Sequence, residues 1–148
     1  MDPVDFISLA GKLAATANAD DAAYRTAVSR AYYGAFHLAA LVLAELGFSA
    51  PRTANVHVFV QRHLNGSRQL PACTAASLLS DLHAARNRAD YQLGHDTVGT
   101  QAVAKWSVEM AHQIRAALLE CSQSPIREHV RTGTSAYVQR ITGARQPR

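Results

Sequence analysis

The chain has 148 residues, of which 48% are hydrophobic and 7% aromatic, and its formal net charge is +4 at pH 7. This length fits one compact domain, because dividing it would leave pieces with too little core. Its two cysteines lie far apart and form no CxxC pair, which argues against a disulfide framework or a zinc site. We therefore expect no metal ion and no cofactor.

No apolar run approaches the roughly 18 residues that a membrane span requires. The longest run, residues 38–44, is interrupted by Glu45, and no signal-peptide pattern opens the sequence. We therefore expect a cytoplasmic protein with no membrane partner.

Helix signals recur along the chain, and strand signals do not. Asp2 and Pro3 open a first short helix, since proline suits the first helical position, and Gly47 ends the longest helix. Helices are predicted over residues 3–16, 21–46, 53–64, 71–92 and 99–121, with a further short helix after Pro125. Because only helix signals recur, we predict an all-α fold. Because the connections are short, we expect an up-and-down helical bundle of four to five main helices.

Apolar residues repeat at helical spacing on the longest predicted helices, and this periodicity predicts their buried faces. On the longest helix the aromatic residues Tyr32 and Phe36 are expected in the core or at an interface. His37 beside them is expected to be a buried histidine with its hydrogen bonds satisfied. On the last long helix Trp106 is expected to face the core.

The net charge is unevenly distributed. Residues 1–122 carry ten basic and ten acidic residues, whereas residues 123–148 carry five arginines and one glutamate. The five arginines are Arg127, Arg131, Arg140, Arg145 and Arg148. We therefore divide the chain into a helical bundle and a basic C-terminal helix or tail at residue 122. Such a tail either attracts nucleic acid or an acidic partner, or is only a solvated end.

Two segments resemble motifs of the HEPN superfamily. Residues 24–39, YRTAVSRAYYGAFHLA, are similar to the Ser-Arg-x-Tyr-Tyr-x-x-Phe-His helix of a branch of small bacterial and archaeal HEPN proteins. Residues 82–91, LHAARNRADY, resemble the Arg-x-x-Ala-Asp-Tyr signature of the same branch. The resemblance covers about residues 5–120. It implies a helical bundle that usually dimerises, and many members are metal-independent ribonucleases of toxin–antitoxin, abortive-infection or CRISPR-associated systems.

In active members of the superfamily, an Arg and a His separated by four to six residues meet their copies across a dimer interface. Arg suits the scissile phosphate, where charge develops in the transition state, because its planar fork can donate two hydrogen bonds. His suits the proton transfers at the 2′-hydroxyl and the leaving oxygen. The set is complete only when two chains meet, so the resemblance implies a homodimer that acts on RNA.

The spacing in this sequence leaves two candidate pairs. Four residues separate Arg86 from Tyr91, which stands where active members place His, and a neutral tyrosine is a poor base at pH 7. Six residues separate Arg88 from His95, which fits the looser form of the motif and places His95 in a connection after the helix. The candidate catalytic residues are Arg86, Arg88, Tyr91 and His95, and the candidate binding residues are Asn87, Asp90, Arg30 and Tyr33.

Three functions stay open. The first is an effector that binds and cleaves RNA as a homodimer in a toxin–antitoxin or phage-defence setting, held in check by a partner such as a nucleotidyltransferase antitoxin. The second, motivated by Tyr91, is a catalytically inactive module that binds a nucleotide or a nucleotidyltransferase. The third is a helical dimeric adaptor, in which Arg86 and Asp90 form only an intrahelical ion pair.

Overall fold

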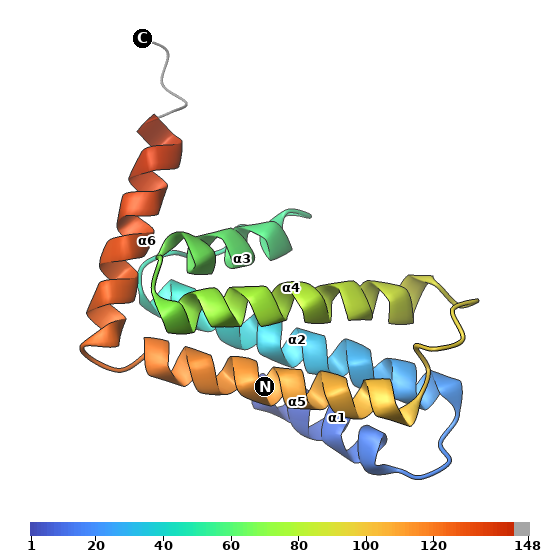
Figure 1. Ribbon diagram of the computed structural model, residues 1–148. Helices are drawn as coiled ribbons and strands as arrows, with labels where there is room; N and C mark the ends of the chain where they lie inside the picture. Colours follow the sequence, from blue (N-terminus) through green and yellow to red (C-terminus); the bar gives the residue numbers. More distant parts are fainter. Residues whose placement is uncertain (144–148) are drawn as a thin grey trace. The chain divides into compact units, whose positions relative to one another are not determined.

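The structure, a computed structural model, describes residues 1–143, and this part of the chain contains six helices and no strand (Figure 1). The helices are α1 (Val4–Ala15), α2 (Asp21–Glu45), α3 (Val56–Gly66), α4 (Leu70–Tyr91), α5 (Gln101–Cys121) and α6 (Ile126–Gly143). The all-α prediction is confirmed. Two details differ: residues 52–55 form a bend and a turn, so α3 begins later than predicted, and the helix predicted to be short, α6, has 18 residues.

Local side-chain and backbone bonds set the helix ends. The Asp2 carboxylate accepts a hydrogen bond from the Val4 amide at 2.9 Å, and that of Asp20 accepts one from the Ala23 amide at 2.8 Å. Each carboxylate satisfies an amide that the first helical turn leaves without a partner. At the end of α2, Gly47 has a φ of +100°, which glycine adopts without strain.

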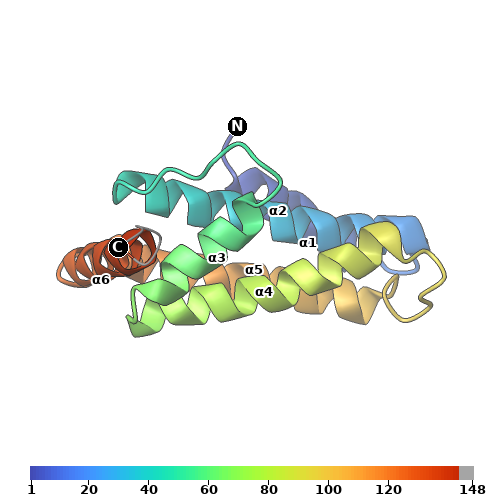
Figure 2. The same ribbon diagram turned by 90° about the horizontal axis from the view of Figure 1, so that it is seen from above.

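The chain forms two compact units, each built from two separate stretches of sequence. We call residues 1–38 with 78–115 unit 1, and residues 39–77 with 116–143 unit 2. Within unit 1, Figures 1 and 2 show the segments of α2 and α4 running in opposite directions, as in an up-and-down bundle. The domain boundary that we place at residue 122 stays a prediction.

Small residues allow the helices of unit 1 to pack closely. Two clusters of buried side chains carry this packing: Ala14, Tyr24, Ala27 and Ala104 in one, and Val28, Ala85, Ala89 and Val98 in the other. Gly34 on α2 lies close against the start of α1, because a Cβ there would lie 3.0 Å from the Pro3 carbonyl oxygen and would overlap the Ile7 side chain. The alanine-rich composition therefore brings backbone segments near one another.

In unit 2, α3 packs against α6 through glycines. The Tyr137 ring lies over Gly66, and the Ser67 backbone lies against Gly133, so that neither glycine has room for a Cβ. Leu64 and Val130 are completely buried in this unit. Of the predicted basic tail, Arg127, Arg131 and Arg140 belong to α6, whereas Arg145 and Arg148 lie outside the described residues.

Two predictions about buried faces are wrong. Trp106 is 40% exposed, because the buried stripe of α5 passes through Ala104, Ser107 and Ala111, one residue out of register with the tryptophan. His37 is exposed rather than buried, and its ring stacks on that of Phe6 with 6.2 Å between centroids. Tyr32 and Phe36 are buried as predicted, with 0% and 5% of their surfaces exposed.

Among the described residues, α2 is the one helix long and apolar enough to cross a membrane, judged by length and composition alone. Of the most apolar 18-residue stretch of α2, 56% is buried inside the protein. This burial is what the core helix of a soluble domain shows, since the apolar side chains already have protein partners. The cytoplasmic location itself stays a prediction.

Candidate functional site

A buried arginine from α2 holds the end of α4. Arg25 is 6% exposed, and its Nη1 atom donates to the carbonyl oxygens of Ala89 at 3.0 Å, Gln92 at 3.2 Å and Arg88 at 3.4 Å. The last carbonyls of a helix have no partner within the helix and carry partial negative charge. The guanidinium therefore satisfies these acceptors and neutralises this end of α4.

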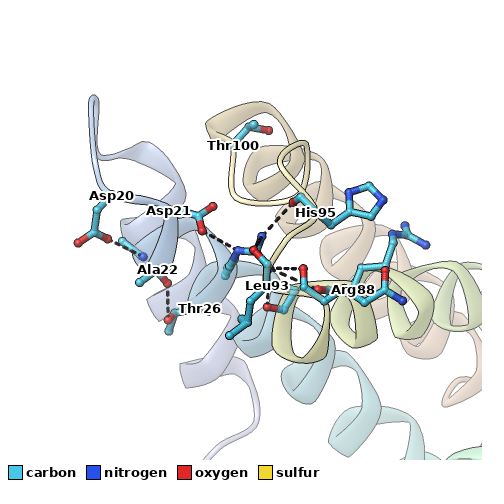
Figure 3. Close-up of polar contacts among 12 residues, drawn as sticks. Asp20, Asp21, Ala22, Thr26, Arg88, Leu93, His95 and Thr100 are labelled. Atoms are coloured by element: carbon cyan, nitrogen blue, oxygen red, sulfur yellow. Dashed lines mark hydrogen bonds and ion pairs between the residues drawn. The ribbon is translucent and has the colours of Figure 1, made fainter.

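The same arginine also holds the loop that follows α4, and three of its partners, Asp21, Leu93 and His95, are labelled in Figure 3. Its Nη2 atom donates to the carbonyl oxygens of His95 at 2.9 Å and Leu93 at 3.4 Å. Its Nε atom donates to Asp21 Oδ2 at 2.8 Å, which closes an ion pair on α2. The sequence assigned Arg25 no role, because five of its six partners are backbone carbonyls, which every residue has; only Asp21, four positions before it, is a side chain.

His95 lies on this loop with its ring in solvent. The His95 amide donates to the Gln92 carbonyl at 3.0 Å, and the Val98 amide donates to the His95 carbonyl at 3.3 Å, so the loop is a series of tight turns. The Nδ1 atom of His95 lies 3.1 Å from Thr97 Oγ1. Nε2 makes no hydrogen bond within the described part of the chain, and it is therefore accessible to a ligand.

Arg88 lies on the last turn of α4 and is half-buried. Within residues 1–143 its guanidinium makes no ion pair, although its carbonyl oxygen accepts a bond from Arg25. In the view of Figure 3, the Arg88 side chain and the His95 ring both point away from Asp21, on the same side of the loop. No hydrogen bond joins these two side chains, and both residues belong to the described part of the chain.

Arg86, in contrast, contacts several neighbouring side chains. Its Nε atom lies 2.9 Å from Asp90 Oδ2 in an ion pair that is not aligned as a hydrogen bond, and 11% of the arginine side chain is exposed. Nη2 donates to the hydroxyl of Tyr33, and also to that of Tyr91 at 3.4 Å. Nη1 donates to Asn87 Oδ1 at 3.0 Å. We call these five residues the Arg86 cluster.

Two arginines lie over the ring of Tyr33. The guanidinium carbon of Arg86 is 5.0 Å from the ring centroid, and that of Arg30 is 5.2 Å from it. The Arg86 guanidinium also lies 5.3 Å from the ring of Tyr91, whose surface is 71% exposed. Cation–π attraction favours these arrangements, so aromatic rings hold the cationic groups near the surface.

Burial shifts the pKa values of two rings near Arg86 toward their neutral forms. Burial raises the pKa of Tyr32 well above its usual value, and the nearby Arg86 charge only partly opposes this rise. Burial lowers the pKa of His83, and the Arg86 charge lowers it further. The rings of Tyr32 and His83 stack with 4.9 Å between centroids. The stacked rings beneath Arg86 are therefore a packed, uncharged support for its ion pair with Asp90.

The structure thus divides the predicted site residues into two neighbouring groups. Arg86, Tyr91, Asn87, Asp90 and Tyr33 contact one another, with Arg30 beside Tyr33. Arg88 and His95 lie at the end of α4 and on its loop. Asp90 also accepts a hydrogen bond from Ser29 Oγ at 3.1 Å, which ties the Arg86 cluster to α2. The catalytic and binding roles of these residues stay predictions.

A groove of about 630 Å³ lies in unit 2, and no residue of the predicted motifs lines it. It is lined by Pro51, Thr53, Asn55, Val58, Phe59, Arg62, His63, Tyr137 and Ile141. Burial lowers the pKa of His63, so this histidine adds less positive charge to the lining of the groove near neutral pH. Within residues 1–143, no three His, Cys, Asp or Glu side chains come together as a metal site.

Comparison with known proteins identifies the family. The protein-family model for the HEPN domain matches residues 13–122, roughly three quarters of the chain. The searches of curated proteins and of solved structures found no significant match. The matched region includes both motif segments and all of the candidate site residues. The chain therefore belongs to the HEPN family, whose domains are typically ribonuclease or nucleotide-binding effector domains.

Proposed function

We propose that this protein is a cytoplasmic RNA-directed effector, which binds RNA and cleaves it as a homodimer without a metal ion. Arg88 holds the scissile phosphate, and His95 transfers protons. The observation that carries the proposal is the pairing of an arginine without an ion-pair partner in residues 1–143 with an exposed histidine on the adjoining, tightly held loop. A toxin–antitoxin or phage-defence setting is the biological context that we propose.

The engagement of each group supports this division of roles. An arginine free of carboxylates can accept a phosphate without first breaking an ion pair, which favours Arg88 over Arg86. The accessible Nε2 atom of His95 can take a proton from the 2′-hydroxyl or give one to the leaving oxygen. Arg86, with Tyr33, supports the position of α4 and presents Tyr91 at the surface.

The homodimer is part of the proposed mechanism. One chain supplies one Arg88 and one His95, whereas stabilising the phosphate and moving two protons require more groups. Tyr91 and Leu93, which precede His95 in the chain, are 71% and 76% exposed. Apolar side chains exposed next to a polar site commonly belong to an interface. We place the second copy of the chain on this surface.

The test is cleavage of labelled single-stranded RNA by the purified protein in EDTA. His95→Ala and Arg88→Ala are expected to slow cleavage by about 100-fold or more, the contribution of a general acid–base group or a phosphate ligand. The matched controls are His112→Ala and Arg115→Ala, exposed residues of α5, which are expected to keep the wild-type rate. Intact RNA with the wild-type protein, or full activity of His95→Ala, would contradict the proposal.

Dimerisation is tested separately. Sedimentation measures the dissociation constant of the dimer, and the cleavage rate per chain is expected to rise with protein concentration across that range. Leu93→Asp is expected to weaken both the dimer and cleavage, because it places a charge on the proposed apolar contact. Cleavage that stays first order in protein below the dimer range would show that one chain is sufficient.

A second function is favoured by one observation, the Tyr91 hydroxyl on Arg86 at the position of the family's histidine. In this alternative the chain is a catalytically inactive module that binds a nucleotide or a nucleotidyltransferase partner. Its signature is binding of ATP in calorimetry, weakened by Arg86→Gln, while RNA stays intact. Cleavage that depends on His95 would rule it out.

A further inference from the structure

We infer that Arg25 is a positioning residue of the proposed site, which sets the place of His95 relative to Arg88 through the backbone. This inference rests on the proposed function for its catalytic meaning. The structural basis is independent: one buried guanidinium from α2 binds carbonyl oxygens on both sides of the point where α4 ends. We call Arg25 and Asp21 together the Arg25 clamp.

The acceptors around Arg25 are enough to engage all of its donors. The Nε–H bonds Asp21, the Nη1 group faces three carbonyls, and the Nη2 group faces two. A guanidinium has five N–H donors in a fixed plane, whereas a lysine has three donors on one atom. Lysine would therefore keep the charge and lose the simultaneous hold on the helix end and the loop. The clamp depends on the shape of arginine as well as on its charge.

Asp21 gives the loop a second point of contact. One carboxylate oxygen bonds Arg25, and the other lies against Gly99, at the place that a Cβ of residue 99 would occupy. Any side chain at this position would displace the carboxylate and disturb the ion pair. A single ion pair on α2 thus contacts the loop near both of its ends.

The loop has little else to hold it. Residues 92–97 are all exposed, and Val98, which is 4% exposed, is the first buried side chain that follows. Burial of apolar surface therefore contributes little to the conformation around His95. The hydrogen bonds from Arg25 to the carbonyls of Leu93 and His95 are the long-range contacts that define it. A shift of roughly 1 Å in a catalytic group can lower a rate by about 100-fold.

The test compares Arg25→Lys with the matched control Arg115→Lys on the exposed face of α5. Arg25→Lys is expected to speed amide hydrogen exchange at His95 and Val98 and to lower kcat for RNA cleavage by about tenfold or more. KM is expected to change by less than about threefold, since Arg88 still binds phosphate. The control is expected to change none of these quantities.

Gly99→Ala provides a second route to the same result. It leaves Arg25 in place and displaces Asp21, so it is expected to speed exchange at His95 and to lower kcat with little change in KM. If Arg25→Lys does not fold, this variant decides by the same measurements. Wild-type exchange and wild-type kcat in a folded Arg25→Lys protein would overturn the inference and leave the proposed function standing. If the wild-type protein cleaves no RNA, the proposed function fails, and the exchange rates alone support or overturn the clamp.

Discussion

The two units of the molecule use their charges in opposite ways. Unit 1 contains seven basic and eight acidic residues, and both ion pairs found within residues 1–143 lie in it. The described part of unit 2 contains six arginines and three glutamates, and none of these arginines is in an ion pair. The basic excess of the described chain therefore belongs to unit 2, whereas the arginines in ion pairs belong to unit 1.

This difference shows that an excess of positive charge indicates where an anionic partner is attracted. It does not indicate where a site with fixed geometry lies. Exposed cations such as those of α6 attract an anionic partner from a distance, and salt screens that attraction. Arg25 and Arg86 are held by several hydrogen bonds each, in a unit whose charges nearly cancel. A ligand site needs such fixed geometry, and unit 1 supplies it although its charge balance is unremarkable.

The largest expected effect is in unit 1, on removal of the buried cation. Arg25→Ala leaves the carbonyls at the end of α4 and the Asp21 carboxylate without their partner. We expect the free energy of unfolding to fall by about 3–5 kcal/mol, measured in urea. Arg131→Ala on the exposed face of α6 is expected to change it by less than about 0.5 kcal/mol. Equal effects of the two substitutions would erase the contrast between the units.

The next largest effect is expected in unit 2, where α3 and α6 are in close backbone contact and no ion pair is found among the described residues. Gly133→Ala drives a Cβ into the Ser67 backbone, so we expect a loss of about 1–3 kcal/mol in the free energy of unfolding. Gly143→Ala is the control on the same helix, because nothing lies within 4 Å of its added Cβ. The control is expected to be neutral or slightly stabilising. A neutral Gly133→Ala would show that α3 and α6 can move apart freely.

A smaller effect is expected at Asp90, whose side chain is 27% exposed. Asp90→Asn removes the charge that pairs with Arg86 and keeps a group that can accept the Ser29 bond. We expect a loss of about 1 kcal/mol in thermal or urea unfolding, because solvent screens this pair. Cleavage is expected to be nearly unchanged, since Arg86 acts as a support. A selective loss of cleavage without a loss of stability would move the active pair from Arg88 and His95 to the Arg86 cluster.

The smallest effect is the dependence of stability on pH, in which both units take part. Burial lowers the pKa of His63 in unit 2 and of His83 in unit 1 below the usual value of 6.5. Just below pH 6.5, the unfolded chain binds more protons at these histidines than the folded chain does. The free energy of unfolding is therefore larger at higher pH and decreases as the pH falls below 6.5. Urea unfolding from about pH 7.5 to about pH 5 measures this slope. His63→Gln is expected to flatten the slope, and an unchanged slope in this variant would contradict the prediction.

The helices and the family could be predicted from the sequence because their signals are local. Helical periodicity, Gly47 and the paired motifs each depend on residues close together in the chain. Buried faces were predicted less well, since apolar character alone placed Trp106 in the core. The observed stripe of α5 instead uses Ser107, whose hydroxyl donates to the Val103 carbonyl at 2.9 Å. A polar side chain that bonds its own helix can be buried there, and periodicity of apolar residues does not register it.

For the candidate site, the sequence by itself determined which residues are candidates for the proposed chemistry. Arg86, Arg88, Tyr91 and His95 follow from the motif spacing, because they lie within ten residues of one another. Only the tertiary structure decided which of them are engaged: Arg86 pairs with Asp90 and Tyr33, whereas Arg88 makes no ion pair within residues 1–143. It also brought Arg25 to the end of α4 from 63 to 70 positions away in the sequence. Carbonyl oxygens are the same in every residue, so folding alone selects the ones that a buried arginine will bind.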